Sequence, residues 1–426
     1  MVELRILRKD TTAVLEAYKK RNLKPEQLNF VHEIIQLDDV RKSLQSQIDQ
    51  QLASLNQMSR DIGELFKSGK ADEANGLKNS VNELKSQTKE LELQLETTKQ
   101  AIEEKLLMLP NVPHEMVPAG TTAEENVIHK QSVEELPQLP ETALPHWDLA
   151  RKYNLFDLEL GVKLSGSGFV VYRAQGAKLQ RALIQFFLDK AVEAGYEELH
   201  VPLLVNADSA RGTGQLPDKE AQMYYVERDD LYLIPTAEVP ITNIYRDEII
   251  KDENFSIKLC GYTPCFRREA GSYGAHVKGL NRVHQFDKIE IVRIEHPDRS
   301  DAALEEMLNH VSSLLGALNL PYRILRLCGG DLGFASAITY DFEVYSAAQK
   351  RWLEVSSVSN FESFQSNRLK LRYKNAKGES VLTHTLNGSA LALARIVAAL
   401  LENNQTDQGI SIPDALRPYT GFDMIR

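Results

Sequence analysis

The chain has 426 residues, of which 42% are hydrophobic and 26% are charged, and this composition excludes a mainly disordered protein. At roughly 150 residues per domain, the length predicts two or three structural units. The net charge of -10 means that any nucleic-acid partner must be met by local basic groups, because the field of the whole molecule repels phosphate.

The three cysteines, Cys260, Cys265 and Cys328, are too few and too irregularly spaced for a disulfide framework or a Cys-x-x-Cys zinc site. We therefore expect buried strand residues in a reducing compartment, and no zinc. The N-terminal segment MVELRILRKD has charges where a signal peptide has an apolar core, and no stretch reaches the ~18 apolar residues of a membrane span. The sequence predicts a cytoplasmic protein that makes no use of a membrane.

Residues 27–109 contain no proline and carry apolar residues at heptad spacing. One series begins at Leu37, Val40 and Leu44, and a second runs from Leu77 to Ile102 in alternating steps of four and three. Both series fit the a/d seam of a left-handed coiled coil. The polar turn Lys67-Ser68-Gly69-Lys70 lies between them, so the sequence predicts an antiparallel helical hairpin about 60 Å long.

Such an arm has two interpretations. Heptads alone favour a dimerisation or spacer element. However, residues 1–110 hold 17 Lys and Arg against 18 Asp and Glu, so most of the negative charge lies in the rest of the chain. A nearly neutral rod with lysines at its tip could approach a polyanion that the body would repel.

Residues 111–145 bear prolines, lack periodicity and read as a linker, and a mixed pattern begins near Trp147. Strands without regularly alternating helices favour an antiparallel sheet in an α+β domain. The expected elements are helices over residues 177–194, 301–318 and 390–401, and strands over residues 199–205, 231–234, 257–260, 289–292 and 322–327.

The stretch from Phe266 to Ile291 holds the first candidate site, with Arg267 and Glu269 before a glycine-rich loop and Arg282 and Phe286 after it. Guanidinium groups bind phosphate oxygens bidentately, and an aromatic face stacks on a base, so these residues suit a nucleotide. A salt-bridged exposed hairpin explains them equally well.

Three further segments carry candidate residues. Arg395 interrupts an apolar helix, so it needs an anion from the protein or from a ligand. Glu354 and Ser357 offer hard oxygen donors that suit Mg²⁺, although such residues are common at strand ends. Thr236-Ala237-Glu238 lies between two prolines and is also explained by a turn. The chain has no Gly-x-x-x-x-Gly-Lys-Ser/Thr loop, so a nucleotide would be bound through arginines.

An arginine-based nucleotide site on an antiparallel sheet resembles the class II aminoacyl-tRNA synthetases, and within them the seryl-tRNA synthetase family. Phe266-Arg267-Arg268-Glu269 with Arg282-Val283-His284-Gln285-Phe286 looks like motif 2 of that class, and the helix ending at Gly195-Tyr196 looks like motif 1, its dimer interface. The segments that resemble the seryl family, in its order, are Leu109 to His114, Gly212 to Pro217, Thr236-Ala237-Glu238, Glu354-Val355-Ser356-Ser357, and Leu386-Asn387-Gly388-Ser389 with Arg395.

The resemblance implies a role for each matching residue. Arg267 and Arg395 would be catalytic, Glu269 would accept from the adenine amino group, and Phe286 would stack on the base. The implied ATP-binding set is Arg267, Arg268, Glu269, Arg282, Val283, Phe286, Glu354, Val355, Ser356, Ser357 and Arg395. The implied serine-binding set is Thr236, Ala237, Glu238, Arg267, Glu290, Asn387 and Ser389, with Glu290 facing the ammonium group. Glu354 and Ser357 would hold Mg²⁺.

The resemblance also implies partners and a division into domains. The expected partners are ATP, L-serine, tRNA(Ser), with tRNA(Sec) as a further possibility, and a second copy of the chain. Residues 1–110 would form a tRNA-binding domain, residues 111–145 a linker, and residues 146–426 the class II catalytic domain. The alternative is a synthetase-like RNA-binding or carrier-charging protein without tRNA ligation.

Overall fold

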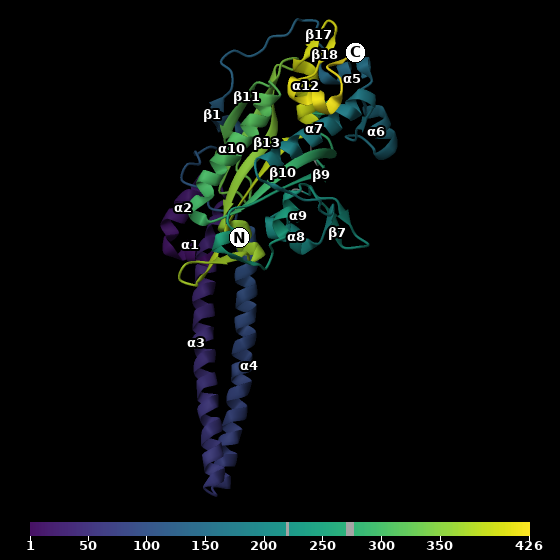
Figure 1. Ribbon diagram of the computed structural model, residues 1–426. Coiled ribbons are helices and arrows are strands. Elements are labelled where there is room, and N and C mark those ends of the chain that lie inside the picture. The colour runs from purple at the N-terminus through teal and green to yellow at the C-terminus, as the bar shows by residue number, and fades with distance from the viewer. Residues whose placement is uncertain (219–220, 270–276) are drawn as a thin grey trace. The chain divides into compact units, whose positions relative to one another are not determined.

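The computed structural model describes residues 1–218, 221–269 and 277–426, which form two compact units (Figure 1). The first unit consists of Val2–Tyr18 and Leu23–Pro110, and we call it the arm unit. The second consists of Met1, Lys19–Asn22 and Asn111–Arg426, and we call it the body. The segment that reads as a linker, residues 111–145, contributes strand β1 to the main sheet of the body.

The arm unit is built on two long antiparallel helices, α3 (Pro25–Lys67) and α4 (Ala71–Met108), with the short helices α1 (Leu4–Lys9) and α2 (Thr11–Lys19) before them. Leu44 and Ile48 of α3 pack against Leu95 of α4 at the heptad positions. The chain reverses through Ser68, Gly69 and Lys70, where Gly69 has a φ of +79°, a value that favours glycine. The predicted hairpin is confirmed, and the 43 residues of α3 make it about 65 Å long.

The body contains an eight-stranded sheet in the order β1-β11-β12-β13-β16-β10-β9-β4. All neighbours are antiparallel except β4 and β9. The strands are β1 (Val127–Gln131), β4 (Glu197–Glu198), β9 (Ile257–Phe266), β10 (Gln285–Glu295), β11 (Tyr322–Arg326), β12 (Ile338–Ser346), β13 (Arg351–Glu362) and β16 (His384–Ala392). The predicted α+β architecture with an antiparallel sheet is confirmed.

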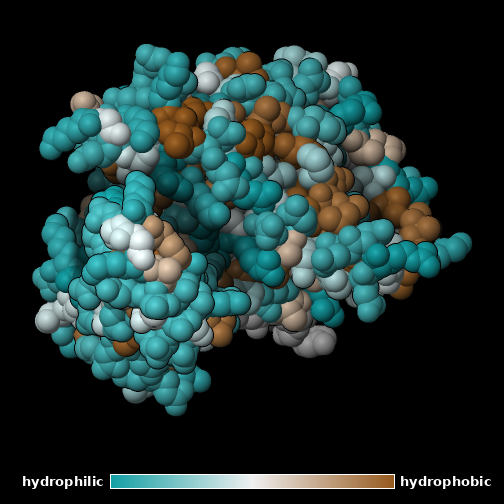
Figure 2. Space-filling model, turned by 90° about the horizontal axis from the view of Figure 1, so that it is seen from below, coloured by the Kyte–Doolittle hydropathy of each residue, from teal (hydrophilic) through white to brown (hydrophobic). Residues whose placement is uncertain are grey.

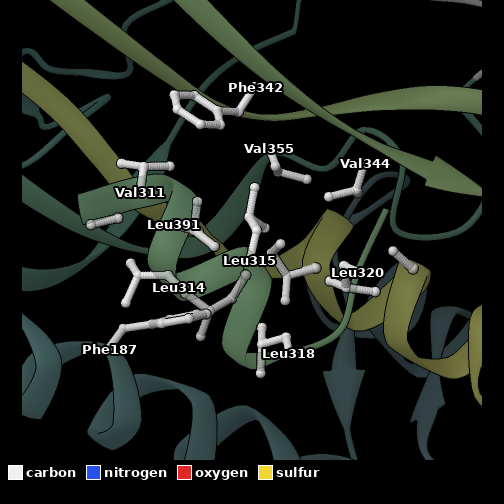
Figure 3. Packing of buried hydrophobic residues seen from close by; sticks show 14 of the residues in the cluster. Phe187, Val311, Leu314, Leu315, Leu318, Leu320, Phe342, Val344, Val355 and Leu391 are labelled. Atoms are coloured by element: carbon white, nitrogen blue, oxygen red, sulfur yellow. The ribbon is translucent and has the colours of Figure 1, made fainter. Parts of the chain in front are cut away.

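The long helices of the body, α7 (Ala174–Glu193), α10 (Ser300–Ala317) and α12 (Leu393–Asn403), pack on the sheet. Figure 3 shows Val311, Leu314 and Leu315 of α10 surrounded by side chains from α7 and from the central strands. Strand β10 shows how the two faces of the sheet differ. Ile289 and Ile291 join this core, whereas Lys288 and Glu290 point to the opposite face, because successive strand residues alternate.

Smaller elements complete the body. They are η1 (Ala123–Glu125), α5 (His146–Tyr153), β2 (Phe156–Asp157), α6 (Leu158–Ser165), β3 (Val171–Tyr172), β5 (Leu204–Val205), α8 (Ala207–Thr213), β6 (Tyr225–Val226), β7 (Leu231–Leu233), α9 (Glu238–Asn243), β8 (Ile249–Lys251), η2 (Asp252–Asn254), η4 (Pro297–Arg299), α11 (Ser363–Leu369), β14 (Arg372–Lys374), β15 (Ser380–Leu382), β17 (Gln405–Thr406), β18 (Gly409–Ser411), η5 (Asp414–Leu416), α13 (Arg417–Thr420) and β19 (Met424–Ile425).

Two sequence predictions about elements are wrong in detail. The helix expected from Ala390 begins only at Leu393, because Ala392 still pairs with Lys288 in the sheet and its apolar neighbours are sheet residues. Of the strand expected over residues 199–205 only β5 (Leu204–Val205) forms, because β4 ends at Glu198 and Pro202, which cannot donate to a strand ladder, lies between the two. The three cysteines are buried, as predicted.

The surface seen in Figure 2 is largely hydrophilic, with hydrophobic residues gathered in patches. Large side chains of the body that are more than 40% exposed include Leu204, Ile244 and Ile249. In the described part of the chain no helix combines the length and the apolar composition needed to span a membrane.

Candidate active site

A cleft of about 1100 Å³ lies on the body and is lined by residues of β10, β11, β12, β13, β16 and α12 and of the loops near them. Most of the predicted site residues line it: Thr236, Glu238, Arg267, Glu269, Arg282, Val283, Phe286, Glu290, Glu354, Val355, Ser356, Ser357, Asn387, Ser389 and Arg395. These residues come from four separate stretches of sequence, so the fold gathers them into one place.

Two predicted residues are absent from the described lining. Ala237 is fully buried in a small apolar cluster with Val201, Ile241, Leu259 and Val292. Arg268 is exposed, and its backbone N–H donates to the carbonyl of Gln222 at 2.8 Å. The loop between Glu269 and Val277, including His276, lies outside the described residues.

One end of the cleft holds buried charges. Lys288, Glu290 and Glu238 are only 5%, 2% and 7% exposed. The Lys288 ammonium lies 2.5 Å from Glu290 Oε2 and donates to the Thr236 hydroxyl at 2.8 Å. The Thr236 hydroxyl in turn donates to Glu290 Oε2 at 3.3 Å. Lys288 forms its ion pair with Glu290, so a ligand that brings a further positive charge would balance the second carboxylate, Glu238.

Glu238 is the carboxylate of this group that makes no ion pair in the described structure. It accepts hydrogen bonds from the side-chain amides of Gln365, at 2.6 Å, and Asn387. Burial and the nearby charge of Glu290 raise the pKa of Glu238 to about 7. The carboxyl group can therefore gain or lose its proton near neutral pH.

Arginines and an aromatic ring form the middle of the cleft. The Arg267 guanidinium lies 5.3 Å from the centre of the Phe286 ring, in a cation–π arrangement. Its position at the end of β9 is fixed by its backbone N–H, which donates to the His284 carbonyl at 2.9 Å. Arg282 forms an ion pair with Glu269. The stretch therefore contains both the salt bridge of the hairpin interpretation and the arginine and aromatic pair of a nucleotide clamp.

Arg395 on α12 is positioned mainly by backbone carbonyls. Its Nε donates to the Asn281 carbonyl at 2.8 Å, and its Nη1 donates to the Glu354 carbonyl at 2.7 Å and lies 3.7 Å from Glu354 Oε2. The side chain is 30% exposed. The guanidinium is therefore oriented in advance and still has donors available to an anion in the cleft.

Glu354 and Ser357 reach the same face of the sheet because of a β-bulge. Glu343 pairs with Glu354 and Phe342 pairs with Ser356, so Val355 has no partner of its own. Residues three apart on a regular strand point to opposite faces, and the extra residue corrects this mismatch. The bulge thereby brings a carboxylate and a hydroxyl together in the cleft.

The oxygen donors at this point fit a divalent cation. Asp341 pairs with Ser357 on the neighbouring strand and hydrogen bonds to its side chain. Burial and the charge of Glu354 raise the pKa of Asp341 well above its ordinary value. Its Oδ1 is buried and has no hydrogen-bond partner in the described structure. Two close carboxylates and a hydroxyl are a hard donor set of the kind that Mg²⁺ prefers, and the buried Asp341 oxygen would gain a partner from such an ion.

Sequence reasoning missed several residues of this site. Lys288, Asp341 and Asn281 line the cleft, and Gln365 contacts Glu238 from behind it. Lys288 lies two residues before the predicted Glu290 on β10, so strand alternation places both on one face and could have revealed Lys288. Asp341 lies on β12, which holds no predicted site residue that could have pointed to it. Asn281 acts through its carbonyl and Gln365 lies beyond the cleft, so their residue types carry no comparable signal.

The chain is similar to known proteins over its whole length. Residues 1–113 match the family described as seryl-tRNA synthetase N-terminal domain, and residues 224–404 match the tRNA synthetase class II core domain (G, H, P, S and T). Serine–tRNA ligase from Salinibacter ruber is 48% identical over 100% of this chain and 99% of its own. The corresponding protein from Methylacidiphilum infernorum is 44% identical over 98% of this chain and 99% of its own.

Solved structures agree with this similarity. The seryl-tRNA synthetase of Pyrococcus horikoshii, crystallised with ATP, superposes with a TM-score of 0.94 at 32% sequence identity. The superposition covers 100% of this chain and 99% of that chain.

Proposed function

This chain belongs to the seryl-tRNA synthetase family and is an ATP-dependent ligase that joins serine to tRNA, and from that premise we propose how its cleft carries out the reaction. The observation that supports the proposal best is the division of one cleft into two parts. Buried Glu238, Glu290 and Lys288 lie at one end, and Arg267, stacked on Phe286, lies beside them.

The buried end would bind serine. Glu290 would face the ammonium group, and Thr236, Glu238, Asn387 and Ser389 would surround the side chain. Ala237 would act by packing behind this pocket, since it is fully buried. The charge balance supports this assignment, because a ligand ammonium would compensate the second carboxylate.

The arginine part would bind ATP. Phe286 would stack on the adenine, and Glu269 would accept from its amino group once its ion pair with Arg282 opens. Arg282 would then be available to the outer phosphates together with Arg395. Val283, Val355 and Ser356 would form the walls, while Arg268, which is exposed, would contact the nucleotide at the rim. The relative from Pyrococcus horikoshii was crystallised with ATP, which supports a nucleotide here.

The proposed chemistry needs positioning and positive charge more than a general base. A serine carboxylate oxygen attacks the α-phosphorus, a P–O bond forms, and the bond to pyrophosphate breaks. Arg267 would lie between the serine carboxylate and the α-phosphate and would stabilise the charge on the equatorial oxygens. The terminal hydroxyl of tRNA then attacks the seryl carbonyl, which gives seryl-tRNA and AMP.

We propose that Glu354 and Ser357 hold Mg²⁺, with Asp341 close enough to contribute. When bound, the ion would neutralise charge on the phosphates. The buried, unpartnered Asp341 Oδ1 supports this assignment.

We further propose that tRNA(Ser) is the polynucleotide substrate and that residues 1–110 bind it through the arm. Residues 146–426 would carry the chemistry, in a cytoplasmic homodimer that uses the motif 1 segment. Exposed apolar side chains such as Leu204, Ile244 and Ile249 support an interface on the body. The similar proteins give no support to tRNA(Sec) as a substrate or to a protein without ligation, and we propose neither.

One assay tests the core of the proposal. The protein should catalyse exchange of pyrophosphate into ATP only when serine and Mg²⁺ are both present, and it should then transfer serine to tRNA(Ser). Absence of serine-dependent exchange would refute the assignment of the cleft. Exchange without transfer would refute only the role of tRNA.

A further inference from the structure

A buried pair of side chains joins helix α5 to helix α12, which pack against each other (Figure 1). His146 of α5 and Glu402 of α12 are fully buried and do not belong to the described lining of the cleft. His146 Nδ1 lies 2.6 Å from Glu402 Oε1, and the backbone N–H of His146 donates to the same oxygen at 2.9 Å. Burial alone would raise the pKa of Glu402, but hydrogen bonds from His146 and from the Ser346 hydroxyl hold it below its ordinary value. The carboxylate is therefore ionised at neutral pH.

The other imidazole nitrogen fixes the backbone just before Arg282. His146 Nε2 accepts from the backbone N–H of Leu280 at 2.8 Å. Because that N–H can only donate, Nε2 carries no proton, and the proton of the neutral ring lies on Nδ1 and is donated to Glu402. The close approach requires Gly279, since a Cβ there would lie 2.2 Å from Nε2 and its φ is +69°. Leu280 is fully buried, so its N–H relies on the imidazole and not on solvent.

A second contact with the same carboxylate holds the next residue. Gln349 Nε2 donates to Glu402 Oε1 at 2.9 Å, and Gln349 Oε1 accepts from the side-chain amide of Asn281 at 2.8 Å. Asn281 is only 3% exposed. One carboxylate therefore holds two successive residues of this segment, one through the imidazole and one through the amide.

The segment leads to Arg395. The carbonyl of Asn281 accepts from Arg395 Nε at 2.8 Å. Arg395 and Glu402 are seven residues apart on α12, about two turns, and so lie on the same side of that helix. Helix α12 therefore contacts one segment at two points, and the segment fixes the Nε of an arginine that lines the cleft.

We propose that His146 and Glu402 are positioning residues for ATP binding, which act through Arg395. The link is the carbonyl of Asn281. The proposal rests on the assignment of Arg395 to the outer phosphates of ATP. A guanidinium held in one orientation binds a phosphate without first losing side-chain freedom. If the imidazole no longer accepts from Leu280, the buried N–H is left unpaired, and the backbone that carries the carbonyl must move to find another partner.

Two substitutions of His146 separate its two hydrogen bonds. Counted in bonds from Cα, the amide of asparagine reaches the position of Nδ1, whereas that of glutamine reaches the position of Nε2. His146→Asn therefore keeps the donor to Glu402 and leaves the Leu280 N–H without an acceptor, and His146→Gln does the reverse. In the pyrophosphate exchange assay, His146→Asn should lower kcat/KM for ATP roughly 10- to 100-fold without changing the KM for serine. His146→Gln should stay close to the unmodified protein.

Three controls separate positioning from a loss of stability. Both substitutions remove one buried hydrogen bond, so both should lower the Tm, although only His146→Asn should affect ATP. The matched control is His384→Asn, because His384 lies 2.8 Å from the Ser300 hydroxyl and outside the described lining of the cleft. This variant should leave kcat/KM for ATP unchanged. In an Arg395→Ala background, His146→Asn should have little further effect, since both changes act through the same side chain.

The outcomes are distinct. The proposal is overturned if His146→Asn and His146→Gln lower kcat/KM for ATP equally, or if the full loss with His146→Asn persists in the Arg395→Ala background. Equal rises in the KM for serine and the KM for ATP in His146→Asn overturn it as well. If the unmodified protein shows no serine-dependent exchange, the proposed function fails, and the positioning role is read from calorimetric binding of ATP with Mg²⁺. That binding should be weaker in His146→Asn than in His146→Gln, and equal binding would overturn the proposal.

Discussion

The substitution Glu238→Gln should stabilise the body while it damages serine activation. Glu238 is 7% exposed, and its pKa rises from 4.5 to about 7 in the folded chain. The folded state therefore holds this proton more tightly than the unfolded state does. Between pH 4.5 and 7 the folded chain binds the extra proton, so its stability declines as the pH rises through that window and stays low above it.

The size of the stability difference follows from the shift in the pKa of Glu238. A difference of about 2.5 pH units at 1.36 kcal/mol per unit corresponds to a cost of roughly 3 kcal/mol for the ionised carboxylate above pH 8. Glutamine has nearly the same shape and never ionises. We expect the free energy of unfolding of the Glu238→Gln variant to exceed that of the unmodified protein by roughly 3 kcal/mol at pH 8.5 and by less than about 1 kcal/mol at pH 5.

Urea unfolding followed by tryptophan fluorescence measures this difference. Both tryptophans, Trp147 and Trp352, lie in the body, so the signal reports on the unit that contains Glu238. Glu227→Gln, at an exposed position of the same unit, is the control and should show no such pH dependence. A stability difference that is the same at pH 5 and pH 8.5 would refute the reasoning, because it would show that Glu238 carries no shifted proton.

Three further predictions concern activity. Deletion of Gln36 to Ile102 should leave exchange intact and abolish tRNA charging. The ion pair between Lys105 and Glu33 shows that the residues flanking this deletion face each other across the hairpin. A shortened protein that charges tRNA normally would contradict the role of the arm. Arg395→Ala should lower the rate of adenylate formation at least ~100-fold, on the scale of roughly 3 kcal/mol for one preorganised donor, and an unchanged rate would make Arg395 a purely structural ion. Glu290→Ala should raise the KM for serine far more than the KM for ATP, and equal changes would remove Glu290 from the amino-acid pocket.

The sequence by itself determined those features that depend on local spacing. The heptads of residues 37–102 and the glycine turn at Gly69 define the arm, because the coiled-coil period and the turn are properties of neighbouring residues. The family and its reaction also followed from sequence, since the motif residues stand in short unbroken segments. The arginines and carboxylates of the cleft that lie within these segments were recognised for this reason.

Only the tertiary structure decided how these residues act together. The bulge at Val355, which turns Glu354 and Ser357 to one face, exists through pairing with a distant strand and leaves no trace in the local pattern. The same holds for Ala392, which looks helical by composition and is a strand residue because it pairs with Lys288. Gln365 meets Glu238 across 127 positions of sequence. Hydrogen bonds between strands and buried side chains depend on contacts that are far apart in the chain, so residue type and spacing could not predict them.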